Sequence, residues 1–263
     1  MGTPKADLMW HGQPFADRIA RLLLRSTDGP LVVVVAPGQD PPQLPSEAVV
    51  VEDGREGRGP LEAIAAGLRA LPDDVVAYVS STDVPLIHPA FVRRVLAAIS
   101  ADVDVAVCET DDRLHPLAAA YRATVLPEIE LLLSANLLRP MKLFEHVRTR
   151  VLDASALLAD SAISNHDPAL TSLLNLNAPT DYERAHKLEL PEIRIERFGT
   201  LRQSSDEPTT VRASTLGAAA RAAGVELDRH IVAALNGDQI TGEAAVPLVT
   251  GDTVAFLSAD GGG

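Results

Sequence analysis

The residue whose position is most suggestive of chemistry is Asp83, which follows an apolar segment at residues 75–79. In an open α/β sheet, ligands bind outside the carboxyl ends of the strands, so a carboxylate there is placed to bind a cation. Mg2+ suits it, because this ion accepts one or two carboxylates and completes its shell with water and phosphate oxygens. Pro85 fixes the backbone just after it, as expected of a tight turn. The alternative is that Asp83 only ends the strand or caps the helix expected from Pro89.

Two further polar groups have suggestive spacing. Asn175 and Asn177 alternate around Leu176, so in an extended segment their amides share one face. They serve either a ligand or a turn before the next helix. The loop Gly57-Arg-Gly-Pro60 precedes a helix and can present backbone N–H groups to a phosphate or a base. It is not a dinucleotide fingerprint, because Glu62 stands at the third glycine position, and a plain turn is the alternative.

The other candidates have simple structural interpretations. Lys5 is a lone cation near the start of the sequence, where a solvated lysine is the ordinary case. His115 has no second histidine at a metal-ligand spacing, which favours a structural histidine. Cys108 is the single cysteine, which excludes an internal disulfide framework and a multi-thiolate metal site. We interpret it as a buried thiol.

The elements that must position these residues follow from hydrophobic patterning. Between residues 14 and about 120, short apolar runs alternate with helical periodicity, which is typical of a sheet covered by helices. The segment Leu31–Ala36 is apolar throughout and rich in β-branched residues, as expected of a parallel strand buried on both faces. The expected strands are 31–36, 48–52, 75–79, 103–108 and 148–152, and the expected helices are 61–71, 89–99 and 125–133. The spacing of Thr180 and Glu183 predicts a capping box and a helix reaching about residue 188.

A change of composition near Pro191 opens an independent segment, residues 192–263. Its pattern predicts a small α+β module with one helix packed on a mixed sheet, because so small a sheet is marginal without a helix. The expected strands are 193–201, 230–236 and 253–257, and the expected helix is 215–223.

Composition sets the class of protein. The 263 residues are 46% hydrophobic and 22% charged, which is typical of a globular chain. The net charge of -13 makes nucleic acid and anionic membranes poor partners. No apolar run approaches the roughly 20 residues of a membrane helix, and no secretion signal opens the sequence. We expect a cytoplasmic protein.

Taken together, several motifs resemble one known family. Residues 1–187 resemble the molybdenum cofactor guanylyltransferases, within the nucleotidyltransferase superfamily, in the order and spacing of six segments. These are Met1-Gly-Thr-Pro-Lys5, Asp53, Gly59-Pro60-Leu61, Thr82-Asp83-Val-Pro85, Arg113-Leu-His-Pro-Leu117 and Leu174-Asn-Leu-Asn-Ala-Pro-Thr-Asp181. The resemblance implies a Rossmann-like α/β domain with a mostly parallel sheet. It also implies Mg2+-dependent transfer of GMP from GTP to the phosphate of the molybdopterin cofactor, with release of pyrophosphate.

The resemblance also implies roles for single residues. Lys5 and Asp83 would be catalytic, Lys5 by neutralising the triphosphate and Asp83 by holding Mg2+ with Asn177 beside it. The nucleotide site would be lined by Lys5, Asp53, Gly59, Pro60 and Leu61. The acceptor side would be formed by His115, Asn175 and Asn177. This fits phosphoryl-type transfer, in which positioning and charge neutralisation supply most of the rate and no protein nucleophile is needed.

Two departures from the family pattern bear on activity. In the family, an apolar strand, a Gly-Gly turn and an arginine precede the Met-Gly-x-x-Lys segment and cradle the phosphates. We therefore expect the true start to lie upstream of Met1, and we expect catalysis only if it does. Ala63 also replaces a glycine that is usual in the family.

Three alternatives to GMP transfer remain for the first domain. They are a CTP-dependent cytidylyltransferase, a sugar-phosphate nucleotidyltransferase, and a non-catalytic domain that scaffolds the second domain.

Residues 192–263 resemble a different family, the small subunit of molybdopterin synthase, which is a β-grasp (ubiquitin-like) sulfur carrier. The segments that carry this resemblance are Ile193–Gly199, Thr215-Leu-Gly217, Leu235-Asn-Gly237, Leu248–Leu257 and Gly262-Gly263. It implies that the terminal Gly263 carboxylate is adenylated and converted to a thiocarboxylate. The implied partners are the synthase large subunit and its adenylating enzyme, and the alternative is an inert glycine tail. The two resemblances together predict a fusion protein of molybdenum cofactor biosynthesis.

Overall fold

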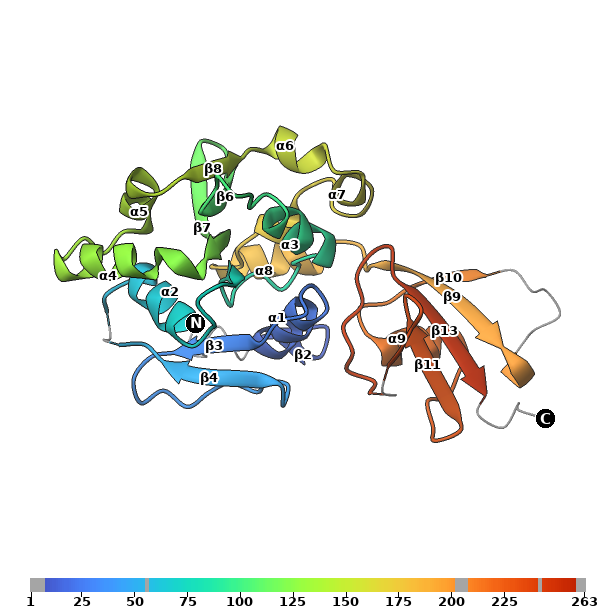
Figure 1. Cartoon of the computed structure of the whole chain (residues 1–263). Helices are drawn as coiled ribbons and strands as arrows, with labels where there is room; N and C mark the ends of the chain where they lie inside the picture. The colour runs from blue at the N-terminus through green and yellow to red at the C-terminus, as the bar shows by residue number, and fades with distance from the viewer. Residues whose placement is uncertain (1–7, 55–56, 202–207, 241–242, 259–263) are drawn as a thin grey trace. The chain divides into compact units, whose positions relative to one another are not determined.

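The computed structural model describes residues 8–54, 57–201, 208–240 and 243–258. Lys5, Gly262 and Gly263, which the sequence singled out, lie outside these ranges. The chain divides into two compact units, each of which is described by itself (Figure 1). Unit 1 comprises Met1–Trp10 and Pro14–Asn177, and unit 2 comprises His11–Gln13 and Ala178–Gly263.

The first part of the chain, up to Asn177, alternates strands and helices. In chain order these are β1 (Met9–Trp10), β2 (Gln13–Pro14), α1 (Phe15–Leu24), β3 (Leu31–Val35), β4 (Ala48–Glu52), α2 (Pro60–Arg69), β5 (Val76–Ser80), α3 (Pro89–Leu96), β6 (Val105–Thr110), β7 (Arg113–Arg122), η2 (Ala123–Val125), α4 (Leu126–Ser134), α5 (Pro140–His146), β8 (Thr149–Leu152), α6 (Ala154–Leu158), α7 (Ser161–His166) and η3 (Thr171–Leu173). The strands expected at 31–36, 48–52, 75–79, 103–108 and 148–152 correspond to β3, β4, β5, β6 and β8.

The largest described sheet of unit 1 has the strand order β5-β7-β6-β8. Strands β5 and β6 are both antiparallel to β7, and β8 is parallel to β6. Strands β5, β6 and β8 therefore run in one direction, and their carboxyl ends meet at one edge of the sheet. Strands β3 and β4 form a separate parallel pair. The fold is α/β, as expected, but the largest described sheet is mixed rather than mostly parallel.

The antiparallel strand β7 results from a tight hairpin. Asp111 and Asp112 both adopt positive φ, 50° and 57°, between the paired residues Thr110 and Arg113. Two successive residues with positive φ are the signature of a type I′ turn, which joins neighbouring antiparallel strands. The run of three alanines in β7, Ala118–Ala120, has little β propensity and hid this strand from the sequence analysis.

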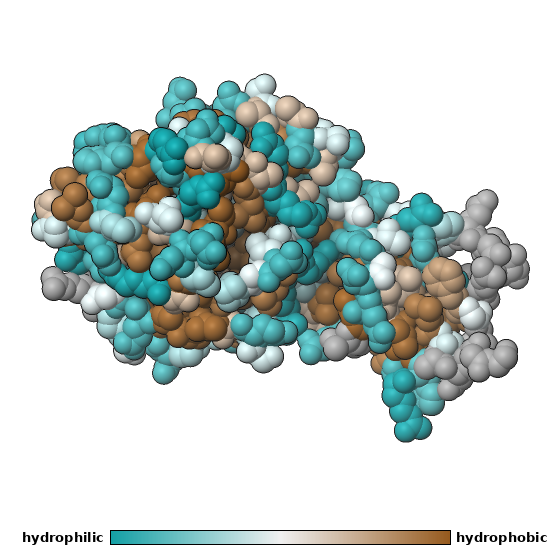
Figure 2. Space-filling model, viewed as in Figure 1, coloured by the Kyte–Doolittle hydropathy of each residue, from teal (hydrophilic) through white to brown (hydrophobic). Residues whose placement is uncertain are grey.

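Strands β3 and β5 each pair on one side only within the described part of the chain. Strand β3 pairs with β4, and β5 pairs with β7. The first four residues of β3 are half-buried, so the expectation of a strand buried on both faces is wrong for this pair. Val49 and Val50 of β4 are 50% and 40% exposed, and Figure 2 shows hydrophobic surface over this strand. A two-stranded sheet has too few neighbours to cover its apolar side chains.

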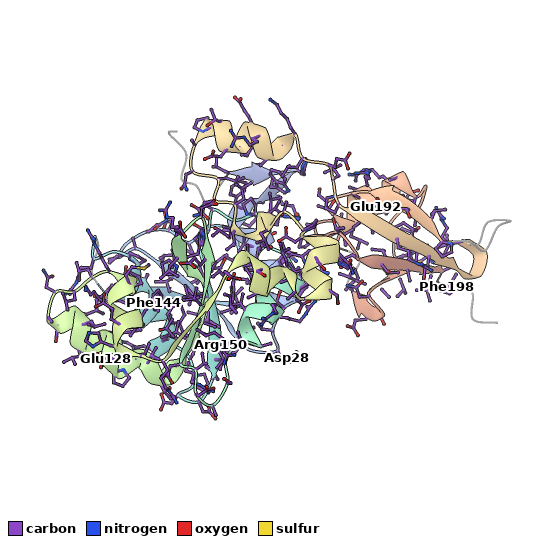
Figure 3. The ribbon with its side chains drawn as sticks, turned by 90° about the horizontal axis from the view of Figure 1, so that it is seen from above. Asp28, Glu128, Phe144, Arg150, Glu192 and Phe198 are labelled. Atoms are coloured by element: carbon purple, nitrogen blue, oxygen red, sulfur yellow. The ribbon has the colours of Figure 1, made fainter. Side chains whose placement is uncertain are left out.

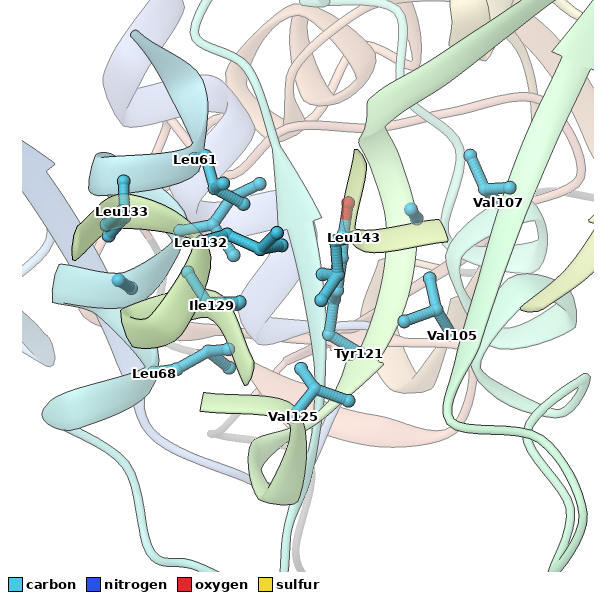
Figure 4. Packing of buried hydrophobic residues seen from close by; sticks show 13 residues of the cluster. Leu61, Leu68, Val105, Val107, Tyr121, Val125, Ile129, Leu132, Leu133 and Leu143 are labelled. Carbon is cyan, nitrogen blue, oxygen red and sulfur yellow. The ribbon is translucent and has the colours of Figure 1, made fainter. Parts of the chain in front are cut away.

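The four-stranded sheet is covered on both faces because its side chains alternate. On one face, Val105 and Val107 of β6 and Tyr121 of β7 pack against α2 and α4 (Figure 4). On the other face, Ala106 and Cys108 of β6 pack against α3, α6 and α7. Because helices pack on both faces of this sheet, the positions of the carboxyl ends of β5 and β6 are fixed.

Unit 2 contains α8 (Pro179–His186), β9 (Glu192–Phe198), η4 (Gly199–Leu201), β10 (Thr209–Arg212), α9 (Leu216–Ala222), β11 (Ile231–Leu235), β12 (Asp238–Ile240) and β13 (Thr253–Ser258). Its sheet has the order β10-β9-β13-β11-β12, and β13 pairs with β9 in parallel while the other pairs are antiparallel. Helix α9 packs on one face, against Ile195 and Phe256 among others. Figure 3 shows Glu192 and Phe198 at opposite ends of β9.

Two details of unit 2 differ from the sequence expectations. Helix α8 begins at Pro179, and the Asp181 carboxylate accepts a hydrogen bond from the Ala178 N–H at 2.9 Å. The capping box predicted from Thr180 and Glu183 is therefore wrong by two residues, because proline at the first helical position sets the start. Strands β10 and β12 were not expected.

All helices in the described ranges are too short or too polar to span a membrane.

Candidate functional site

Asp83 lies in the turn that follows β5, at the carboxyl edge shared by β5, β6 and β8. The residue is 8% exposed, and its Oδ1 accepts a hydrogen bond from Ser81 Oγ at 2.5 Å. It does not cap the next helix, because the N-cap of α3 is His88, whose Nδ1 accepts the Ala90 N–H at 3.1 Å. The carboxylate is thus held in the turn rather than used for helix capping.

The segment that carries the two asparagines is hydrogen-bonded to the Asp83 turn. The Leu176 N–H donates to the Asp83 carbonyl oxygen at 2.8 Å. Leu176 is fully buried, whereas Asn175 and Asn177 on either side of it are exposed. The segment is not part of a sheet, but the alternation expected from the sequence is present. Asp83, Asn175 and Asn177 therefore belong to one neighbourhood.

The start of β7 runs beside the same turn. Ser80, the last residue of β5, pairs with Ala118, so residues 113–117 extend past the end of β5 toward the Asp83 turn. His115 in this stretch is half-buried, and its Nε2 lies 2.7 Å from Thr110 Oγ1. Burial, and secondly the charge of Arg113, lower the pKa of His115 below its usual 6.5. The imidazole is consequently neutral at neutral pH and can exchange hydrogen bonds with a ligand.

Cys108 pairs with His115 across β6 and β7 and is fully buried. Burial raises the pKa of its thiol to about 12. Since the thiolate is the nucleophilic form of cysteine, this residue does not act as a nucleophile. The interpretation of Cys108 as a structural thiol is therefore supported by its environment.

Asp53 and Gly59 lie in the loop that joins β4 to α2. The Asp53 N–H donates to the Val35 carbonyl oxygen at 2.7 Å, which fastens the residue to the end of β3. Its Oδ1 is buried and has no hydrogen-bond partner in the part of the chain that the structure describes. A buried carboxylate oxygen without a donor is costly, so this atom is suited to accept a hydrogen bond from a ligand.

Gly59 is the N-cap of α2, with φ of 77° and ψ of −175°, a conformation that is essentially restricted to glycine. Pro60 follows at the first helical position, where its missing N–H costs nothing. Leu61 is fully buried in the core between α2 and α4, so its side chain packs and only its backbone can face a ligand. Of these three residues, Gly59 is the one whose type is dictated by local geometry.

A polar groove of about 400 Å³ lies beside this loop, along α2 and α4. Its charges are paired within the protein: Arg58 lies 3.4 Å from Glu62, and Arg69 lies 3.0 Å from Glu130. Arg58 also donates to the Leu133 carbonyl oxygen at 2.6 Å. Because its cations are matched by carboxylates, the groove offers no net positive charge to a polyphosphate.

The donor set around Asp83 fits Mg2+. Among the described residues, no group of three or more His, Cys, Asp or Glu side chains is gathered as a metal site. Mg2+ takes one or two protein carboxylates and fills its shell with substrate phosphates and water. The Asp83 carboxylate and the amide oxygens of Asn175 and Asn177 are of the ligand type that this ion takes.

The structure adds one residue that the sequence analysis missed. The Arg18 Nε–H in α1 donates to the Pro85 carbonyl oxygen, in the Asp83 turn, at 2.9 Å. Arg18 is 2% exposed. The available signal was its position three residues after Phe15, on the same buried face of the helix.

The fold and this site define an α/β domain that gathers carboxylate and amide side chains at the carboxyl ends of its strands, as nucleotide-binding domains do. Residues 1–150, more than half of the chain, match the model of the MobA-like NTP transferase domain family. The chain belongs to this family, and its first domain is a nucleotidyltransferase.

Individual relatives agree with this assignment. The chain is 28% identical over 184 residues to the molybdenum cofactor guanylyltransferase of Desulfosudis oleivorans, which covers 70% of this chain and 86% of that protein. It is 33% identical over 154 residues to the "Probable molybdenum cofactor guanylyltransferase" of Mycobacterium tuberculosis H37Rv, covering 57% and 71%.

Among solved structures, the molybdopterin-guanine dinucleotide biosynthesis protein A of Archaeoglobus fulgidus aligns with a TM-score of 0.52 at 21% identity, covering 70% of this chain and 89% of that one. A nucleotidyl transferase from Methanothermobacter aligns with a TM-score of 0.50 at 18% identity, covering 69% and 82%. At these identities, the similarity establishes the fold alone.

Proposed function

We propose that residues 1–187 transfer GMP from GTP to the phosphate of the molybdenum cofactor and release pyrophosphate. The observation that carries this proposal is the hydrogen bond between Leu176 and Asp83, because it joins the expected metal ligand to the expected acceptor-side asparagines. The proposal is also supported by the similarity to two relatives that are named as a molybdenum cofactor guanylyltransferase and a probable one. Transfer of this kind needs two phosphate-bearing substrates held in line. The carboxylate of Asp83 and the amides of Asn175 and Asn177, at one edge of the sheet, are suited to hold them.

On the metal side, Asp83 would hold Mg2+, with Asn177 beside it. The ion would supply charge neutralisation to the phosphates of the nucleotide. Lys5, outside the described residues, would add a positive charge to the triphosphate. No protein nucleophile is required, which agrees with the inert, buried thiol of Cys108.

On the nucleotide side, the unpartnered Oδ1 of Asp53 is an acceptor, and guanine offers adjacent donors in its N1–H and its 2-amino group. Gly59 lets the backbone turn into α2, whose first N–H groups can face an anion. Pro60 and Leu61 would contribute through the backbone only. This arrangement supports GTP over CTP as the donor.

On the acceptor side, His115 and Asn175 would contact the molybdenum cofactor. His115 is the group at this edge whose pKa is lowered, so it would act as a neutral hydrogen-bonding residue and not as a cation for the phosphate. Asn175 is exposed and therefore accessible to a ligand from solvent.

The test is pyrophosphate release by the full-length protein with Mg2+, the molybdenum cofactor and each of GTP, CTP, ATP and UTP. We expect release with GTP, its loss in Asp83→Ala, and no effect of Asp73→Ala, an exposed aspartate just before β5. Release with CTP instead would support a cytidylyltransferase. Turnover of a sugar phosphate would support a sugar-phosphate nucleotidyltransferase. Absence of GTP binding would support a non-catalytic scaffold.

We further propose that residues 192–263 form a β-grasp domain that acts as a sulfur carrier. The supporting observation is the sheet order β10-β9-β13-β11-β12, in which the first and last long strands are parallel neighbours and one helix covers one face. The carrier terminus would be Gly262-Gly263, outside the described residues. The partners would be the synthase large subunit and its adenylating enzyme.

The sulfur-carrier proposal is tested by mass spectrometry of the C-terminal peptide after incubation with ATP, an adenylating enzyme and a sulfur donor. A thiocarboxylated Gly263 would support it, with the variant lacking Gly262 and Gly263 as the control. Unchanged sulfur transfer by that variant would show that the tail is inert.

A further inference from the structure

The turn after β5 is anchored at several points. The Asp83 carbonyl accepts the Leu176 N–H at 2.8 Å, and the Val84 carbonyl accepts the Ile87 N–H at 3.1 Å. The side chains of Val84 and Ile87 are 4% and 0% exposed, so the turn is also pinned by packing. The Pro85 carbonyl is held by a side chain from another element, through its 2.9 Å hydrogen bond from Arg18 Nε.

Burying Arg18 to hold the Pro85 carbonyl has a high desolvation free energy. At 2% exposure, it is the largest of the fully buried side chains among the described residues. Arginine is rarely fully buried, because its guanidinium loses hydration that only good partners replace. A guanidinium at this depth is kept only where its N–H groups donate to fixed acceptors, and one of these is the Pro85 carbonyl oxygen.

A guanidinium differs from a neutral donor in two useful ways. It stays protonated at every working pH, so the hydrogen bond to Pro85 does not titrate. Its planar group presents N–H donors in fixed directions, and charge-assisted hydrogen bonds are shorter and stronger than neutral ones. Both ends of the segment Asp83–Pro85 are thereby restrained, at Asp83 by Leu176 and at Pro85 by Arg18.

We propose that Arg18 is a positioning residue: by holding the Pro85 carbonyl, it fixes the turn that aims the Asp83 carboxylate at the metal. The inference rests on the proposed function of Asp83 and adds a residue to it. Arg18 itself does not touch the metal or the substrates in this proposal. Its removal is expected to loosen the turn and weaken metal binding, and to leave the core of α1 in place.

The experiment compares Arg18→Met and Arg18→Lys with the wild-type protein and with Asp83→Ala. Arg21→Met is the matched control, because Arg21 lies one turn along the same helix and pairs with Asp17 at 3.0 Å. Mn2+ binding in the presence of GTP is followed by electron paramagnetic resonance. Hydrogen exchange reports on the Ile87 amide, and the midpoint of thermal unfolding reports on folding.

We expect Arg18→Met to weaken Mn2+ binding roughly 10-fold, the lower end of the effect of residues that orient metal ligands, and to speed exchange at Ile87. Arg18→Lys should recover part of the affinity, because it keeps a charged donor. Arg21→Met should bind Mn2+ as the wild type does. If Arg18→Met does not fold, Arg18→Lys alone decides: wild-type Mn2+ affinity together with faster Ile87 exchange would contradict the proposal.

The outcomes separate this inference from the proposed function. Equal Mn2+ affinity in Arg18→Met and wild type, with a loss in Asp83→Ala, overturns the role of Arg18 and leaves Asp83 as the metal ligand. Equal affinity in wild type and Asp83→Ala overturns the metal role of Asp83, and the role of Arg18 falls with it.

Discussion

The backbone N–H of Leu176 donates to the carbonyl oxygen of Asp83 and joins two segments from distant parts of the chain. One segment ends a strand and carries a carboxylate, and the other carries two exposed amides around a buried leucine. Because the bond is made by backbone groups, it sets the spacing of the segments independently of the functional side chains. Those side chains can then be changed without loss of the scaffold, which makes them suitable for mutational tests.

Asp83→Asn removes the negative charge and keeps the shape of the side chain. We expect pyrophosphate release to fall about 100-fold or more, because the remaining amide is a poor ligand for Mg2+. The amide can still receive the hydrogen bond from Ser81, so the midpoint of thermal unfolding should change little. Steady-state assays over a range of Mg2+ concentrations measure the effect, with Asp73→Asn as the control. Activity within about twofold of wild type would contradict a metal role for Asp83.

Gly59→Ala tests the turn into α2. The conformation of Gly59, φ 77° and ψ −175°, strains any residue with a Cβ, although the nearest atom to an added Cβ is the Leu138 oxygen at 3.8 Å. The cost is therefore conformational rather than steric, about 1–3 kcal/mol. We expect a lower free energy of unfolding and a higher KM for GTP, measured by urea titration and by initial rates.

Gly29→Ala is the matched control for that experiment. An added Cβ at Gly29 meets no atom within 4 Å, and its φ lies outside the left-handed region. We expect it to be neutral or slightly stabilising, because alanine restricts the unfolded chain. An equal loss of stability in the two variants would show that the Gly59 conformation is not the cause.

Local patterning predicted the strands β3, β4, β5, β6 and β8 and the helices α2, α3 and α4 of unit 1, but not the helices α1, α5, α6 and α7. Apolar runs located β3, β4, β5 and β6, because a strand rich in β-branched residues between turn residues is a local signal. Strand β7 escaped because its alanines carry no such signal, although Asp111-Asp112 marks its turn. Strand β12 was also not expected, although Asn236-Gly237, with φ of 54° and 98°, is a hairpin signal that precedes it.

The candidate site was only partly predictable for a different reason. The type and position of Asp83 followed from the end of a strand, but its contact with Leu176 is tertiary and leaves no local pattern. The same is true of the hydrogen bond from Arg18 to the Pro85 carbonyl group. Backbone acceptors have no residue type, so a side chain that binds one cannot be matched to its partner from the sequence.

Acid stability depends in part on the ion pair between Asp104 and Arg148, at 2.6 Å. The hydrogen bond from Arg148 holds the pKa of the Asp104 carboxyl below its usual 3.8. The pair therefore stabilises the fold at pH above 3.8, and this contribution is lost as the pH falls through the lowered pKa. We expect Arg148→Met to reduce the free energy of unfolding at pH 7 slightly, and to have no effect below the pKa of Asp104.

Urea unfolding between pH 7 and pH 3 measures this dependence, with Lys142→Met as the control because Lys142 forms an exposed pair with Glu145 in one helix. High salt should also reduce the difference at pH 7, since an exposed pair is screened. A difference between wild type and Arg148→Met that grows on acidification would contradict the assignment.

The turn before β13 depends on Asp252, which is 4% exposed. Its carboxylate accepts hydrogen bonds from Asn236 Nδ2 at 2.8 Å and from the Val249 N–H at 2.9 Å, and Asn236 in turn accepts the Thr253 N–H. Asp252→Ala would leave the buried Val249 N–H unsatisfied and would remove the link to the exposed Asn236, so we expect a loss of about 1–3 kcal/mol in unit 2. Hydrogen exchange of β11 and β13 amides measures it, with the exposed Asp238→Ala as the control. Because unit 1 has its own core, its amides should keep their protection; loss of protection throughout both units would show that the two unfold together.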